Sequence, residues 1–157
     1  VVRRRRSDRR LVMQQKEFLA ALDQPRVVEA IKQAENATSG EIRVHVQPKA
    51  GDDIRKVAER TFERLGMTKT ELRNGVLLFI ASAQQRFVIL GDKGIDEKVP
   101  GGFWDDIAAK LTIRFKAAEF TDGIVDAIRS AGEHLARYFP HQANDVDELP
   151  DEIDVES

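Results

Sequence analysis

Apolar residues recur at helical spacing in four stretches of the chain, and each stretch follows residues that can begin a helix. The first stretch follows Asp23, which is a good N-cap, and Pro25 falls in its first turn, where the missing N–H costs nothing. We predict that the other helices begin after Asp52 or Asp53, after 100–102 and at Thr121.

Three stretches between these helices have the patterns of β-strands. Residues 41–46 alternate between polar and apolar, which predicts a strand with one polar face that carries His45. Residues 76–81 and 87–90 are apolar throughout, as is typical of strands covered on both faces. A helix between the first two strands predicts a parallel pair, and the short loop 82–85 predicts an antiparallel hairpin. The expected fold class is therefore α/β, a small mixed sheet with helices on both faces.

The charge is distributed unevenly, although the net charge of the 157 residues is only −2. Residues 1–12 carry six Arg and one Asp, whereas residues 141–157 carry seven acidic and no basic side chains. Blocks of like charge at the ends of a chain are usually solvated and disordered. We therefore predict a disordered basic extension at 1–12, a single domain at 13–140, and an acidic, disordered tail at 141–157.

The composition excludes several classes of function. No Cys is present, so disulfides, thiolate metal sites and cysteine nucleophiles are ruled out, and three His make a multi-histidine zinc centre improbable. No window approaches the roughly 18 apolar residues of a membrane span, and the basic arm lacks the apolar region of a secretion signal. The central domain is not basic. We therefore expect a cytoplasmic protein that is not an integral membrane protein and binds no nucleic acid.

The strand directions gather polar residues at one rim of the predicted sheet. The start of the first strand, the start of the second and the end of the third share this rim, which holds Ser39, Glu41, Arg73, Asn74, Asp92, Lys93 and Asp96. The carboxylates Glu41, Asp92 and Asp96 are hard ligands suited to Ca²⁺, Mg²⁺ or Mn²⁺. Arg73, Asn74 and Lys93 are candidates for binding a phosphate. The alternative is structural, because carboxylates at strand ends often cap the backbone and Asn74-Gly75 favours a turn.

Four motifs in order resemble the TPM domain family. They are Thr-Ser-Gly-Glu-Ile-Arg-Val at 38–44, Leu-Gly-Met at 65–67 with Arg-Asn-Gly-Val-Leu-Leu at 73–78, Gly-Asp-Lys-Gly-Ile at 91–95, and Phe-Thr-Asp-Gly-Ile at 120–124. The resemblance covers about 16–140 and is greatest to short, stand-alone bacterial members of the family, which also includes a thylakoid-lumen acid-phosphatase-like protein and a photosystem repair protein. It implies a three-layer α/β/α sandwich with a Rossmann-like appearance.

The resemblance also implies candidate functions. The plant-type members carry a phosphatase label, and other members are similar to divalent-cation binders or to partners of LemA-type membrane-associated assemblies. Carried onto this sequence, the motifs imply an acidic site of Glu41, Asp92 and Asp122, with Arg73 and Asn74 as secondary residues. Our first hypothesis is a bacterial interaction module that binds Ca²⁺ or Mg²⁺ and a protein partner. The alternative is a metal-dependent phosphomonoesterase.

Overall fold

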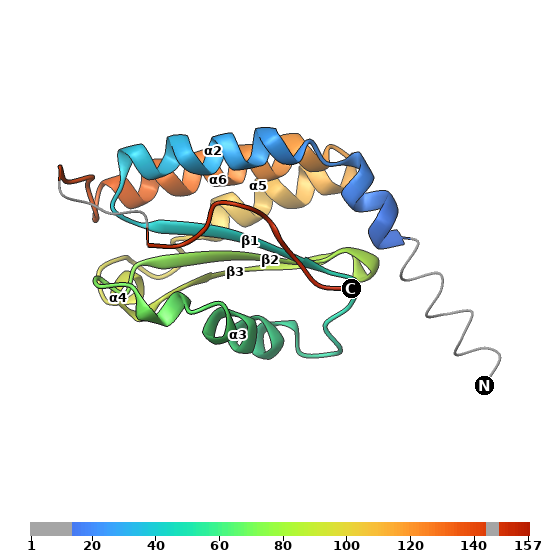
Figure 1. Cartoon of the computed structure of the whole chain (residues 1–157), viewed down its shortest axis with the longest axis horizontal. Coiled ribbons are helices and arrows are strands. Elements are labelled where there is room, and N and C mark those ends of the chain that lie inside the picture. Colours follow the sequence, from blue (N-terminus) through green and yellow to red (C-terminus); the bar gives the residue numbers. More distant parts are fainter. Residues whose placement is uncertain (1–13, 144–147) are drawn as a thin grey trace.

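A four-stranded sheet lies between two layers of helices in the computed structural model, which describes residues 14–143 and 148–157 (Figure 1). One face of the sheet is covered by α2 (Gln24–Ala37), α5 (Asp105–Lys116) and α6 (Phe120–Ala136). The other face is covered by α3 (Ile54–Arg64). The predicted α/β fold with three layers is confirmed.

The sheet is mixed, and its strand order is β3-β2-β1-β4. β1 (Glu41–Gln47) runs parallel to β2 (Gly75–Ala81), and β2 pairs antiparallel with β3 (Arg86–Gly91) through the short 3₁₀ turn η2 (Ser82–Gln84). The predicted parallel pair and hairpin are both correct. β4 (Asp154–Val155) was not predicted; it pairs parallel with the outer edge of β1.

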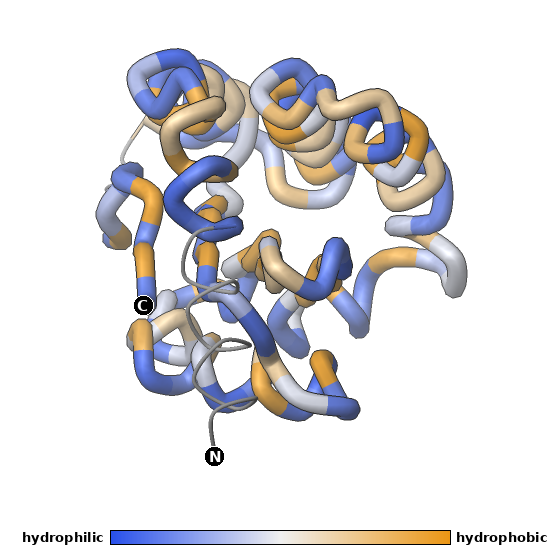
Figure 2. Tube along the Cα trace, turned by 90° about the vertical axis from the view of Figure 1, so that its right-hand side faces the viewer, coloured by the Kyte–Doolittle hydropathy of each residue, from blue (hydrophilic) through white to orange (hydrophobic). Residues whose placement is uncertain are grey.

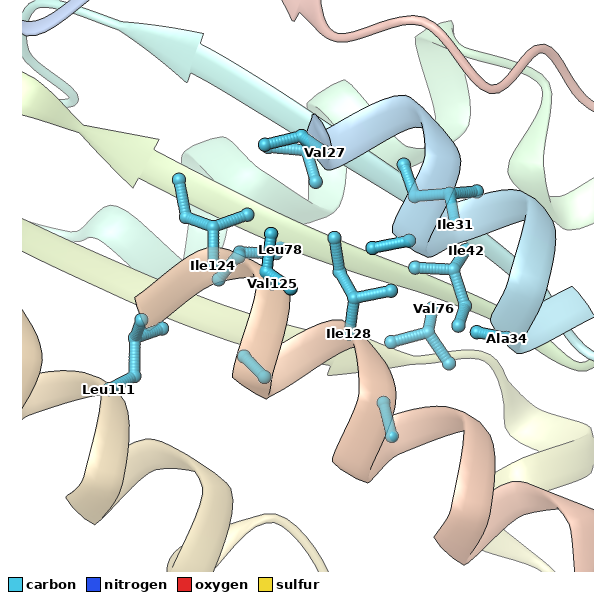
Figure 3. Packing of buried hydrophobic residues seen from close by; sticks show 14 of the residues in the cluster. Val27, Ile31, Ala34, Ile42, Val76, Leu78, Leu111, Ile124, Val125 and Ile128 are labelled. Atoms are coloured by element: carbon cyan, nitrogen blue, oxygen red, sulfur yellow. The ribbon is translucent and has the colours of Figure 1, made fainter. Parts of the chain in front are cut away.

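The larger hydrophobic core lies between the sheet and α2, α5 and α6. The apolar residues of β1 and the matching positions of β2 point into this layer, where they meet the apolar stripes of the helices. Figure 3 shows this packing for Val27, Ile31 and Ala34 of α2, Ile42 of β1, Val76 and Leu78 of β2, Leu111 of α5, and Ile124, Val125 and Ile128 of α6. The hydrophobic positions of these helices face the sheet and their hydrophilic positions face outward (Figure 2).

A smaller core lies beneath the other face of the sheet. Ala58 and Phe62 of α3 pack there against Leu77 and Phe79 of β2. Because α3 contacts mainly β2 and β3, the corresponding face of β1 is not covered by this helix. That face carries the polar positions of β1, and they are buried nonetheless.

The helix ends agree with the sequence in two cases and differ in a third. The side chains of Asp23 and Asp53 accept hydrogen bonds from the N–H groups of Arg26 and Lys56. Asp23 is therefore the N-cap as predicted, and of the two alternatives Asp52 and Asp53 the cap is Asp53. α6 instead begins at Phe120, so Thr121 is not its cap. The Thr121 hydroxyl accepts the N–H of Asp23, at 3.0 Å, and so joins the starts of α2 and α6.

Two short helical segments, α4 and η1, connect the longer elements. Lys93–Asp96 form a one-turn helix, α4, whose N-cap is Asp92. A 3₁₀ turn, η1 (Met67–Lys69), follows Gly66. Along the described part of the chain, no helix is both long enough and apolar enough to cross a bilayer.

The prediction of a disordered acidic tail is wrong for residues 148–157. This segment (dark red in Figure 1) runs along β1. It contributes β4, and the N–H of Glu156 donates to the carbonyl of Val46 at 2.9 Å. Leu149 and Ile153 pack against the two cores, so apolar residues within the acidic run anchor it. The predicted basic extension at 1–12 lies outside the described residues.

Candidate functional site

The strand ends that were predicted to share one rim of the sheet do lie together in the structure. Glu41 and Gly75 begin neighbouring strands, and Gly91 ends the third. The N–H of Glu41 donates to the carbonyl of Asn74, and the N–H of Asp92 donates to the carbonyl of Gly75. The start of β2 therefore lies between the two predicted carboxylate ligands.

Asp92 is engaged in a structural contact at this rim. Its carboxylate accepts two hydrogen bonds from the guanidinium of Arg73, at 2.6 and 2.8 Å, and a third from the N–H of Lys93 at 2.8 Å. These bonds and the negative charge of Asp92 raise the pKa of Arg73. The side chain predicted to bind a phosphate is thus held by the side chain predicted to bind a metal.

The other predicted rim residues differ in their surroundings. Lys93 and Asp96 are exposed on α4. Asn74 is buried, and its amide donates to the hydroxyl of Ser39 at 3.3 Å. Two of the predicted phosphate ligands are thus bound to other side chains, Arg73 to Asp92 and Asn74 to Ser39.

Asp122 lies at the far end of the helix layer. It is in the first turn of α6, where Arg26 of α2 binds its carboxylate at 3.1 Å. The opposite end of α6 adjoins the start of β1, because Ser39 donates to the carbonyl of Phe139 just beyond that helix. A helix rises 1.5 Å per residue, so α6 places Asp122 about 20 Å from that end. The grouping of Asp122 with Glu41 that the resemblance implied is not formed.

Glu41 instead has two acidic neighbours that the sequence did not indicate. Glu35 comes from the last turns of α2 and Asp151 from the C-terminal segment. With Glu41 they line a cavity of about 540 Å³ beside the start of β1. We call this cavity the acidic cleft. Lys32, Ser39 and His141 also line it.

The carboxyl groups of Glu35, Glu41 and Asp151 are each held by the backbone or by another carboxyl group. Glu35 accepts the N–H of Ile42 at 3.1 Å and shares a hydrogen bond with Asp151. Glu41 accepts the N–H of Glu148 at 2.7 Å. The cleft is therefore formed where α2, β1 and the C-terminal segment meet.

The crowding of these carboxyl groups makes one of them retain its proton. Burial, the hydrogen bond that protonated Glu35 donates to Asp151 and the negative charges of Asp151 and Glu41 raise the pKa of Glu35 to about 10, against the opposing effect of the Ile42 N–H. Asp151 is itself buried, and its Oδ1 has no hydrogen-bond partner among the described residues. No group of three or more His, Asp or Glu side chains in 14–143 and 148–157 stands ready to hold a metal ion.

Replacing Glu35 by glutamine should stabilise the protein and flatten its response to pH. A carboxyl group with a raised folded-state pKa binds more protons folded than unfolded, so wild-type stability falls as pH rises from about 4.5 toward 10. Glutamine keeps an acceptor for the Ile42 N–H and carries no charge. Thermal melts of Glu35→Gln at pH 8 should show a gain of about 1–2 kcal/mol, or roughly 4 °C. Glu59→Gln, at an exposed position of α3 outside the acidic cleft, is the matched control. Equal pH profiles for Glu35→Gln and wild type would contradict this expectation.

Comparison with known proteins places this architecture in a family. The TPM domain model matches residues 12–134 of the chain. The chain is 43% identical to the BA42 protein of the psychrophilic bacterium Bizionia argentinensis, whose NMR structure superposes with a TM-score of 0.81 over 85% of this chain and 92% of that one. A comparison with curated proteins found no match. The chain belongs to the TPM domain family.

Proposed function

We propose that this chain is an interaction module that binds a divalent cation in the acidic cleft. The observation that carries the proposal is the buried carboxylate of Asp151, whose Oδ1 has no hydrogen-bond partner in the described residues although it lies beside Glu35. Burying a carboxylate oxygen without a partner is costly, and a cation would remove that cost.

The donor set fits a hard cation. Carboxylate oxygens, backbone carbonyls and water are the ligands of Ca²⁺ and Mg²⁺, and Glu35 and Asp151, which share a hydrogen bond, would supply the charged ones. The cation would take the place of the proton on Glu35, since metal ligands bind in their deprotonated form. With few charged ligands and an open cleft, we expect a weak site, with a Kd on the order of 10⁻⁴–10⁻³ M.

The phosphomonoesterase alternative has less support. Arg73, its expected phosphate ligand, is bound to Asp92. His45, which the sequence places on the polar face of the first strand, is fully buried. A cation that bridges α2, β1 and the C-terminal segment would instead order a surface for a partner protein. The LemA-type assembly stays an expectation from the family resemblance.

An amide-resolved NMR titration of the full chain with Ca²⁺, then Mg²⁺, tests this proposal. Saturable shifts are expected at Glu35, Ile42 and Asp151, because these backbone groups adjoin the cleft. Asp122 serves as an internal control, since it lies at the far end of α6. Shifts centred on Asp92, or spread evenly over exposed acidic residues, would refute the cleft as the cation site.

A further inference from the structure

One face of β1 is a row of buried polar side chains. Glu41, Arg43, His45 and Gln47 alternate along the strand, and each is at most 9% exposed. A strand face that is permanently covered by a helix is normally apolar. The neighbouring positions of β2, Leu77 and Phe79, are apolar in this way. The alternation in β1 is instead typical of a strand face that meets water.

The cover over this row is the chain's own C-terminal segment. Asp154 binds the ring Nδ1 of His45 at 2.6 Å and the guanidinium of Arg64 at 3.4 Å. The carbonyl of Glu156 accepts the side-chain amide of Gln15 at 2.6 Å. The contacts at this end of the segment are thus mostly polar and are made by acidic residues.

The polar row of β1 carries a basic side chain whose hydrogen-bond donors are not all satisfied by residues 148–157. Arg43 is 7% exposed, and its Nε has no hydrogen-bond partner among the described residues. The other ring nitrogen of His45 lies 2.7 Å from Oε1 of Gln47, whose amide nitrogen donates to the carbonyl of Lys49. Both nitrogens of His45 therefore lie within hydrogen-bond distance of side-chain oxygens.

The segment is attached over a short length. Only Asp154 and Val155 pair with β1, and Val155 is 44% exposed. Leu149 and Ile153 are the segment's partly buried apolar contacts, and terminal segments with so few of them open at lower free-energy cost than global unfolding. Opening would uncover the β1 edge and its polar row, to which an extended peptide could add as a strand.

We propose that the edge and polar row of β1 form a docking groove for an extended acidic segment of a partner protein, which residues 148–157 occupy in the isolated chain. The argument for this occupant is the seated segment itself, with its alternating acidic side chains, and their complement in Arg43, His45 and Arg64. Glu41 belongs to both the polar row and the acidic cleft, and Asp151 belongs to residues 148–157, so release of this segment would also open the proposed cation site. The two proposals are tested separately, because Asp154 and Arg64, the residues changed below, do not line the acidic cleft.

The test uses the full chain and a fluorescent peptide with the sequence of residues 148–157. Asp154→Lys reverses the charge that faces His45 and Arg64, so it should release the segment of the chain itself. Fluorescence anisotropy should then show at least tenfold tighter peptide binding by Asp154→Lys than by wild type. The affinity should fall with added salt and on the further change Arg64→Glu. Glu133→Lys, exposed on α6, is the control with the same net charge.

Three results would overturn the proposal. They are equal peptide binding by Asp154→Lys and wild type, binding that is insensitive to Arg64→Glu, and concentration-dependent dimers of Asp154→Lys, which would indicate exchange of segments between copies.

Hydrogen exchange on wild type gives a second test that needs no variant. The amide of Glu156, bonded to Val46, should exchange at least a hundredfold faster than those of β2. Equal protection would mean that the segment is a permanent part of the sheet.

Discussion

Replacing Gly94 by alanine is expected to destabilise the protein by about 3 kcal/mol or more, which lowers the Tm by about 10 °C. A Cβ at this position would overlap the backbone carbonyl oxygen of Leu72 and stand 2.6 Å from that of Arg73. Both are backbone atoms, so relief requires a shift of the main chain. The N–H of Gly94 also donates to the carbonyl of Arg73, so that shift would disturb the rim as well.

Thermal melts followed by circular dichroism check this expectation. Gly101→Ala is the matched control, because a Cβ there would meet nothing within 4 Å. Its Tm should stay close to that of wild type. A Gly94→Ala variant as stable as Gly101→Ala would show that the chain near Arg73 does not pass Gly94 as closely as described.

Replacing Asp92 by alanine is expected to cost on the order of 2 kcal/mol. Asp92 caps α4 and holds Arg73 through two hydrogen bonds. Arg73 has a left-handed backbone conformation, with φ 51°, which these bonds help to maintain. Loss of the carboxylate therefore removes the cap of α4 and also releases the turn at Arg73.

Asp96→Ala provides the comparison, because Asp96 lies in the same short helix but is exposed. Chemical denaturation should place Asp92→Ala well below wild type and Asp96→Ala within about 0.5 kcal/mol of it. If the two variants lost the same small amount, Asp92 would have no structural role, and its carboxylate would again be a candidate metal ligand.

The fold could be predicted because its signals are local. The alternation of β1, the apolar run of β2 and the caps Asp23 and Asp53 depend on neighbours within a few residues, and all four were correct. β4 was not predicted, because the acidic composition of residues 141–157 favours a solvated tail. The signal that could have found it is the series Leu149, Ile153 and Val155, which interrupts the acidic run with apolar residues.

The candidate site could be predicted only in part, because it is assembled from distant segments. Glu41 was identified from its place at a strand start, and it does line the acidic cleft. Glu35 lies on a helix turn with no motif, and Asp151 is more than a hundred residues away in the chain. The sequence also could not show that Asp92 and Arg73 bind each other, since each alone suits an external ligand.

Calorimetric titration of Ca²⁺ into Asp151→Asn and Asp92→Asn tests most directly where the proposed cation site lies. Both variants remove one buried carboxylate, and asparagine keeps the size of each side chain. Binding in the acidic cleft predicts that Asp151→Asn loses at least tenfold in affinity while Asp92→Asn binds as wild type does. Unchanged binding by Asp151→Asn, with loss in Asp92→Asn, would contradict the cleft and return the site to the rim.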